Sequence, residues 1–117
     1  MYKEIEDCLL LNKSIKDNNL VKLTWGNASV LSENGKYIAI KPSGVDFAKL
    51  SYSEICIVEL YTGKQISGKK PSVDTAIHLE IYKAFPEIKS IIHSSFKVCY
   101  LLGTSNETYS YSRNYTR

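Results

Sequence analysis

One stretch of sequence decides how this chain folds: Ala28-Ser29-Val30-Leu31-Ser32-Glu33-Asn34-Gly35-Lys36-Tyr37-Ile38-Ala39-Ile40. Both of its ends are mainly apolar, and between them stands Asn34-Gly35, a dipeptide that readily adopts the left-handed backbone of a tight turn. An Asn-Gly pair between apolar runs predicts a β-hairpin. We therefore expect strands over residues 28–31 and 37–40.

The segments around the hairpin alternate between helical and strand patterns. Residues 4–16 repeat apolar side chains on one helical face, and residues 72–85 do so again, starting at a serine and ending before a proline. Residues 55–58 and 88–93 read as buried strands, and a weaker strand is expected near residues 65–66. This order predicts an α/β fold with a mixed, largely antiparallel central sheet and flanking helices.

Composition limits what the chain can be. With 117 residues, of which 44% are hydrophobic, it can bury one core and forms one domain at most. Its net charge of +3 comes from scattered Lys and Arg, so nucleic acid is not expected as a partner. A membrane is not expected either, because the sequence contains no long apolar run and no signal-peptide pattern, and the expected location is the cytoplasm.

Three loop segments carry residues that suit a phosphate group: Thr24-Trp25-Gly26-Asn27, Lys41-Pro42-Ser43-Gly44-Val45-Asp46 and Pro71-Ser72-Val73-Asp74. A phosphate needs backbone N–H groups, short hydroxyl donors and a close approach. The residues that can provide these are Gly26, Asn27, Ser43, Gly44 and Ser72, and Lys41 can add a positive charge. Taken alone, each loop also fits a plain turn, and Ser72 fits the N-cap of its helix.

In order and spacing the three loops resemble those of the class II aldolase and adducin family, most closely the L-ribulose-5-phosphate 4-epimerases. The resemblance covers residues 5–93. It implies a homotetrameric enzyme that binds a phosphorylated sugar and uses zinc as a Lewis acid on the oxygens of that sugar while a C–C bond breaks and re-forms. A fuculose-phosphate-type aldolase is the alternative, and Asp74, where such aldolases carry Glu, favours the epimerase. A non-catalytic phosphosugar-binding module and an adducin-like interaction domain are further alternatives.

The sequence also departs from the family pattern. The second serine that the family carries after Ser72 is Val73 here, so one hydroxyl donor to phosphate is missing. The resemblance assigns the family's acidic catalytic residue to Asp74 and a zinc-binding histidine to His93. The family's strand ends in His-x-His, whereas this chain reads His93-Ser94-Ser95, and a catalytic zinc site needs three protein ligands. His93 fits a buried strand histidine equally well, and His78 is expected to be structural.

Beyond residue 93 the sequence becomes rich in Ser, Thr, Asn and Tyr and loses the resemblance. A shift of the reading frame by one base accounts for this change. With free choice of synonymous codons, residues 95–103 can then be read as His-Ser-Lys-Tyr-Ala-Thr-Cys-Trp, which restores the family's second histidine. We therefore divide the chain into residues 1–93, the N-terminal part of a class II aldolase or epimerase domain, and residues 94–117, an out-of-frame tail. The chain as written is expected to be inactive.

Overall fold

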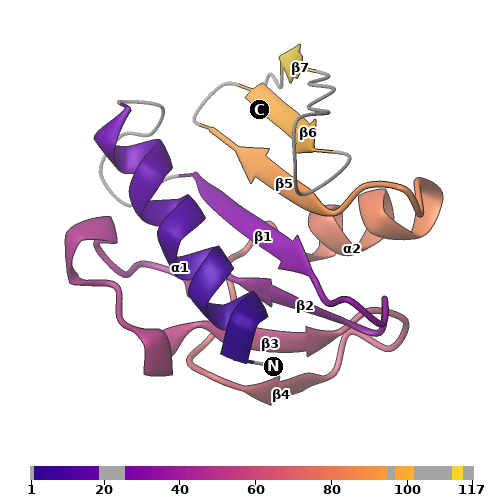
Figure 1. Ribbon diagram of the computed structural model, residues 1–117, viewed down its shortest axis with the longest axis horizontal. Helices are drawn as coiled ribbons and strands as arrows, with labels where there is room; N and C mark the ends of the chain where they lie inside the picture. Colours follow the sequence, from indigo (N-terminus) through magenta and orange to yellow (C-terminus); the bar gives the residue numbers. More distant parts are fainter. Residues whose placement is uncertain (1, 19–25, 95–96, 102–111, 115–117) are drawn as a thin grey trace.

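The computed structural model describes residues 2–18, 26–94, 97–101 and 112–114 (Figure 1). The helices are α1 (Tyr2–Asp17) and α2 (Thr75–Ala84), with two short 3-10 helices, η1 (Phe47–Lys49) and η2 (Tyr52–Glu54). The strands are β1 (Asn27–Leu31), β2 (Tyr37–Ile40), β3 (Cys56–Glu59), β4 (Gln65–Ser67), β5 (Ser90–His93), β6 (Lys97–Leu101) and β7 (Ser112–Asn114).

The strands form one sheet in the order β4-β3-β2-β1-β5-β6-β7, and every pairing in it is antiparallel. This confirms the expected α/β fold with a largely antiparallel sheet. The predicted hairpin is confirmed as β1 and β2, with Ser29 opposite Ile40. Its turn has Gly35 at a φ of +73°, a conformation that glycine adopts without steric cost.

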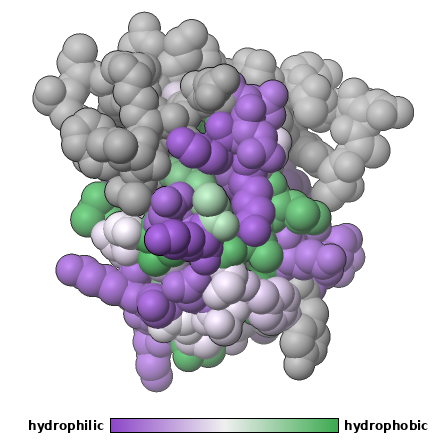
Figure 2. Space-filling view, turned by 90° about the vertical axis from the view of Figure 1, so that its left-hand side faces the viewer, coloured by the Kyte–Doolittle hydropathy of each residue, from purple (hydrophilic) through white to green (hydrophobic). Residues whose placement is uncertain are grey.

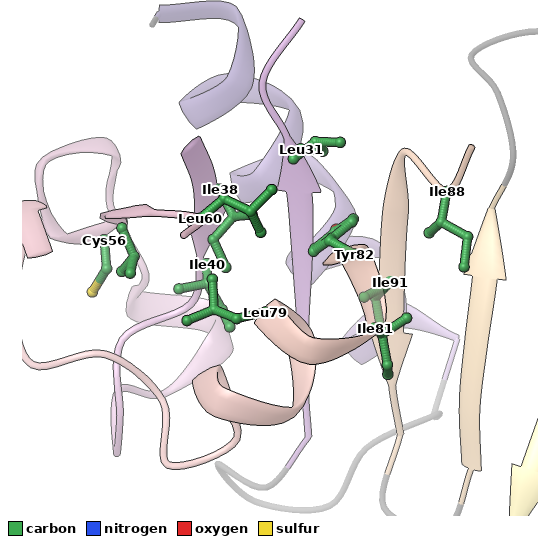
Figure 3. Packing of buried hydrophobic residues seen from close by; sticks show 11 residues of the cluster. Leu31, Ile38, Ile40, Cys56, Leu60, Leu79, Ile81, Tyr82, Ile88 and Ile91 are labelled. Atoms are coloured by element: carbon green, nitrogen blue, oxygen red, sulfur yellow. The ribbon is translucent and has the colours of Figure 1, made fainter. Parts of the chain in front are cut away.

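The two helices cover opposite faces of the sheet. Side chains alternate between the faces along a strand, so Ile38 and Ile40 point to one side and Ala39 to the other. Ile38 and Ile40 belong to the core that includes Leu79 of α2, which lies beside Ile40 in Figure 3. Ala39 packs instead in the core that includes Cys8 of α1. Each helix thus buries one apolar stripe against its own face of the sheet.

Two features differ from the expectation. The second helix begins at Thr75 and not at Ser72, because residues 72–75 form a turn in which the Thr75 N–H donates to the Ser72 carbonyl at 3.1 Å. The sheet also continues past residue 93, where β6 pairs with β5 and β7 with β6. The origin of residues 94–117 in a shifted frame stays a prediction, because these pairings do not test it.

The surface agrees with the scattered charges of the sequence. On the face seen in Figure 2, the residues coloured by hydropathy are mostly hydrophilic, with hydrophobic residues visible between them. Among the described residues, neither helix has the length and apolar character needed to cross a membrane.

Gly68, which follows β4, is predicted to be required for folding. Its φ is +92°, and a Cβ there would overlap the Ile55 carbonyl oxygen and lie 2.7 Å from the Cys56 Cα. We expect Gly68→Ala to lower the free energy of unfolding by at least about 2 kcal/mol, through backbone strain and overpacking together. Urea denaturation measures this change.

Gly35→Ala is the matched control, because Gly35 has a similar positive φ but nothing within 4 Å of the added Cβ. Gly35→Ala should lower the free energy of unfolding by roughly 1 to 2 kcal/mol, through backbone strain alone. If the two variants lose the same free energy of unfolding, the structure accommodates the added Cβ at position 68 without an overpacking cost, which would contradict the prediction.

Candidate functional site

The start of β1 lies at the centre of one end of the sheet. β1 runs antiparallel to both of its neighbours, so Asn27 at its beginning lies directly opposite His93, the last residue of β5. For the same reason, the chain that leaves β2 after Ile40 passes beside the start of β1. Two of the three predicted loops and the predicted metal ligand therefore converge at this end.

The third loop is joined to the second by backbone hydrogen bonds. The Ser43 N–H donates to the Lys70 carbonyl at 2.8 Å, and the Ser72 N–H donates to the Lys41 carbonyl at 3.1 Å. The two loops also form an isolated antiparallel bridge. The fold thus brings together the described parts of all three loops, whereas Thr24 and Trp25 lie outside the described residues.

The carboxamide of Asn27 connects these loops to the second helix. Asn27 is only 3% exposed, and its Nδ2 donates to Ser72 Oγ at 2.9 Å and to Asp74 Oδ2 at 3.0 Å. Its Oδ1 lies 2.5 Å from Nε2 of His78. Each polar atom of this buried side chain therefore has a partner, as a buried amide requires.

Behind Asn27 a chain of polar groups continues into the core. The Nδ1 atom of His78 lies 2.7 Å from Ser29 Oγ, which lies 2.8 Å from the hydroxyl of Tyr82. His78, Ser29 and Tyr82 are all buried. The pKa of His78 is lowered to about 3, chiefly by burial and also by the nearby His93, while Asp74 opposes the shift. His78 is therefore neutral near pH 7.

The grouping of these polar side chains follows from the two-residue repeat of a strand and the four-residue spacing along one side of a helix. Asn27 and Ser29 are two residues apart on a strand, so their side chains share the sheet face that α2 covers. Asp74, His78 and Tyr82 are four residues apart, so they lie one above another on the helix side that meets this face. Asn27 and Ser29 thus meet the row formed by Asp74, His78 and Tyr82.

Asp74 and His93 form the only part of the predicted metal site that the described residues show. His93 Nδ1 lies 3.0 Å from Asp74 Oδ2, and both side chains are about 8% exposed. No group of three or more His, Cys, Asp or Glu side chains suited to a metal ion occurs in the described part of the chain. Two ligands do not fit a catalytic zinc ion, which takes three from the protein. Ser95, where the family carries the next histidine, lies outside the described residues.

Lys41 occupies an unexpected position for a phosphate ligand. Its side chain is buried, with Nζ 3.2 Å from the Pro42 carbonyl and 4.6 Å from the centre of the Phe47 ring. Burial lowers the pKa of Lys41, and the neighbouring Asp46 opposes this shift. The Lys41 ammonium group therefore donates a hydrogen bond to the backbone of its own loop.

The remaining predicted phosphate residues lie on the more accessible side of the loops. Gly26 and Gly44 have φ values of 90° and 71°, which fit a backbone that approaches a ligand closely. Ser43 is half-buried, and Gly44 is exposed. Val73, which replaces the family's second serine, is 76% exposed and lies two residues before the start of α2.

Comparison with known proteins decides the family. Residues 6–110 match the sequence model of the class II aldolase and adducin N-terminal domain. The chain belongs to this family. The chain of a solved L-fuculose 1-phosphate aldolase superposes with a TM-score of 0.74 and 29% identity over 80% of this chain. YgbL from Escherichia coli, described as a putative aldolase/epimerase/decarboxylase, has a TM-score of 0.70 and 26% identity over 77% of it.

A third structure, the L-fuculose 1-phosphate aldolase from Glaciozyma antarctica PI12, matches with a TM-score of 0.67 and 25% identity over 80% of this chain. The class II aldolase resemblance read from the three loops is thereby confirmed. This chain covers 44%, 42% and 40% of the three solved chains, in the order named. It therefore spans less than half of the length of these structures.

Sequence reasoning missed Ser29 and Tyr82 and treated His78 as structural only. The structure shows that His78 contacts Asn27, a predicted site residue. The signal was present in the sequence, because the polar residues at 27 and 29 follow the strand period and those at 74, 78 and 82 follow the helix period. Each residue alone is unremarkable, and only the pairing of β1 with α2 makes them one group.

The depressed pKa of His78 predicts a pH dependence of stability. The unfolded chain binds a proton at this residue below pH 6.5, whereas the folded chain does so only below about 3. The contribution of neutral His78 to the free energy of unfolding is therefore lost as the pH falls between these values. From pH 7 to pH 5 the free energy of unfolding should fall by about 2 kcal/mol. Urea denaturation at the two pH values should show this loss, and His78→Gln should reduce it. An equal loss in both proteins would place the proton uptake elsewhere.

Proposed function

We propose that this chain is part of an L-ribulose-5-phosphate 4-epimerase-like protein and that its described loops bind the phosphate of a phosphorylated sugar. The observation that carries the proposal is the convergence of three predicted phosphate loops, joined through Ser72 to both Lys41 and Asn27. The start of α2 at the same place adds N–H groups and the positive end of a helix dipole, which favour an anion.

The roles proposed for the residues follow from their positions. Gly26, Ser43 and Gly44 offer backbone N–H groups, and Ser72 offers a hydroxyl. For Asn27, which the sequence predicts to bind phosphate directly, we propose a supporting role instead, because its carboxamide is bound to Ser72, Asp74 and His78. Asp74 is held 3.0 Å from both Asn27 Nδ2 and His93 Nδ1, so its carboxylate has a fixed position next to the phosphate loops. A carboxylate held in this way is suited to move a proton on a bound sugar, which is the role proposed for Asp74.

Zinc is the family's usual cofactor, and its bound ion polarises the oxygens of the sugar. In this chain His93 would be a zinc ligand, with Asp74 nearby. The described residues supply too few ligands for a catalytic site, so we propose that the chain as written does not turn over substrate. Tetramer formation, which the family resemblance implies, and the expected cytoplasmic location belong to the same proposal.

A fuculose-phosphate-type aldolase is a second candidate, favoured by the names of two of the similar structures. The epimerase is preferred because the first loop reads Thr24-Trp25-Gly26-Asn27 and because Asp74 stands where such aldolases typically carry Glu. A phosphosugar-binding module without catalysis would bind phosphate without metal, and an adducin-like interaction domain would bind neither.

Phosphate binding is predicted to depend on the start of α2. We expect millimolar affinity for a phosphorylated pentose, on the order of 4 kcal/mol, with the amide signals of Gly26, Gly44 and Ser72 shifting first. Val73→Ser restores the missing hydroxyl and should tighten binding roughly 2- to 10-fold, the worth of one hydrogen bond. Ser72→Ala should weaken binding by a similar factor.

Ser53→Ala is the control for this titration, because Ser53 is an exposed serine in η2, in none of the three loops. It should leave the affinity unchanged. Shifts that cluster away from the three loops, or a Val73→Ser variant that binds no better, would count against the proposed phosphate site.

Zinc binding and turnover are predicted to separate. Ser95→His should raise zinc affinity, because it restores the family's His-x-His, but it should not restore epimerase activity while the rest of the tail is unchanged. Repairing the frame across the tail should restore both. Isothermal titration with zinc and an epimerase assay measure the two effects, and zinc-dependent epimerisation by the unaltered chain would defeat this part of the proposal.

The proposed frame shift has its own test. Sequencing the gene across codons 92–97 should show bases that spell His-x-His one position downstream of the present frame. An unbroken frame without those bases would remove the explanation and leave residues 94–117 as an ordinary part of the domain.

A further inference from the structure

We propose that His78 is a positioning residue that fixes the orientation of the Asn27 carboxamide and thereby directs the hydroxyl hydrogen of Ser72 outward, toward a phosphate oxygen. This inference rests on the proposed function, because it explains how the Ser72 hydroxyl becomes a hydrogen-bond donor to the bound phosphate. It assigns a role to a buried histidine that the predicted phosphate and metal sites leave unused.

The direction of each hydrogen bond follows from Asp74. A carboxylate oxygen only accepts, so the atom of Asn27 that lies 3.0 Å from Asp74 Oδ2 must be its amide nitrogen. The amide oxygen of Asn27 then faces His78, and at 2.5 Å the Nε2 atom of His78 must donate to it. The carboxamide orientation is thus set from two sides, by an acceptor at Asp74 and a donor at His78.

The hydrogen bonds that lie deeper in the core also have fixed directions. A neutral imidazole that carries its hydrogen on Nε2 has an acceptor at Nδ1, so the Ser29 hydroxyl donates to His78. The Ser29 oxygen then accepts from the Tyr82 hydroxyl, 2.8 Å away. The buried chain of hydrogen bonds therefore runs in one direction, from Tyr82 through Ser29 and His78 to Asn27.

At the other end of this chain, Ser72 is left as a donor. Its Oγ accepts from Asn27 Nδ2 at 2.9 Å and from the Asp74 N–H at 3.2 Å. Two accepted hydrogen bonds use the lone pairs of a hydroxyl, so its own hydrogen points away from both donors. Among the described residues, the hydrogen bonds of the Ser72 hydroxyl are both accepted ones, so its hydrogen can serve an anion at the loops.

The opposite orientation of Asn27 would have the opposite effect. With the carboxamide turned over, its oxygen would lie against the Asp74 carboxylate, and two acceptors would face each other in a buried place. Ser72 would then donate its hydrogen inward to Asn27, and the phosphate would lose its hydroxyl donor. The donor on His78 therefore distinguishes a binding arrangement from a non-binding one.

Two substitutions of His78 separate positioning from packing. His78→Gln places an amide N–H near the position of Nε2 and so keeps the donor to Asn27, whereas His78→Asn reaches only toward Ser29 and leaves Asn27 without that donor. Both variants remove the ring, so both should lower the melting temperature. The readouts are the side-chain NH₂ signals of Asn27 in the full 117-residue chain and its affinity for inorganic phosphate.

We expect nitrogen NMR of the unaltered chain to show the His78 proton on Nε2 at neutral pH. The Asn27 NH₂ signals should stay in place in His78→Gln, but in His78→Asn they should move and exchange with solvent at least tenfold faster. Phosphate affinity should fall less than threefold in the first variant and about tenfold in the second, which corresponds to 1.4 kcal/mol.

A proton on Nδ1 of His78, or Asn27 signals that respond equally to both substitutions, would overturn the inference. If the unaltered chain binds no phosphate at all, the proposed function fails, and the His78 proton and the Asn27 signals still decide whether His78 orients Asn27. The two failures are therefore distinguishable in one set of samples.

Discussion

The arrangement of this site depends on one buried carboxamide, that of Asn27. A buried amide must find partners for all of its polar atoms. Asn27 finds them on Ser72 and Asp74, which precede α2, and on His78 within it. Because Asn27 also lies opposite His93, the same residue fixes the end of β5. The three predicted phosphate loops and the pair Asp74 and His93 are thus held in one geometry by a side chain that is itself almost fully buried.

The fold provides the rigid frame that this geometry needs. α1 and α2 bury their apolar stripes on opposite faces of the sheet, and the polar chain from Tyr82 to Asn27 lies on the face that α2 covers. Residues on regular elements are placed more reproducibly than residues on free loops. Gly26, Ser43 and Gly44 lie in loops, but the buried polar residues that support them belong to β1 and α2. The loop residues can therefore still be held in place.

Most of the fold was predictable from the sequence, since the Asn34-Gly35 turn and the apolar periods mark the central hairpin and both helices. The start of α2 was not, because Ser72 satisfies a helix cap and a turn equally well as a sequence pattern, and only its contact with Asn27 decides between them. Site residues on loops were found through the family resemblance. Ser29, His78 and Tyr82 were not assigned to the site, because their grouping depends on which strand packs against which helix. The buried position of Lys41 depends likewise on its contact with Phe47.

We propose that the buried Asn27 side chain fixes the positions of Ser72 and Asp74, whereas Ser72 itself contacts the anion. A crystal structure of the chain with bound phosphate tests it most directly. We expect a phosphate oxygen about 2.8 Å from Ser72 Oγ, with the Asn27 carboxamide still hydrogen-bonded to Asp74 and His78. An Asn27 side chain that leaves Asp74 to contact the phosphate itself, or a phosphate bound away from the three loops, would contradict it.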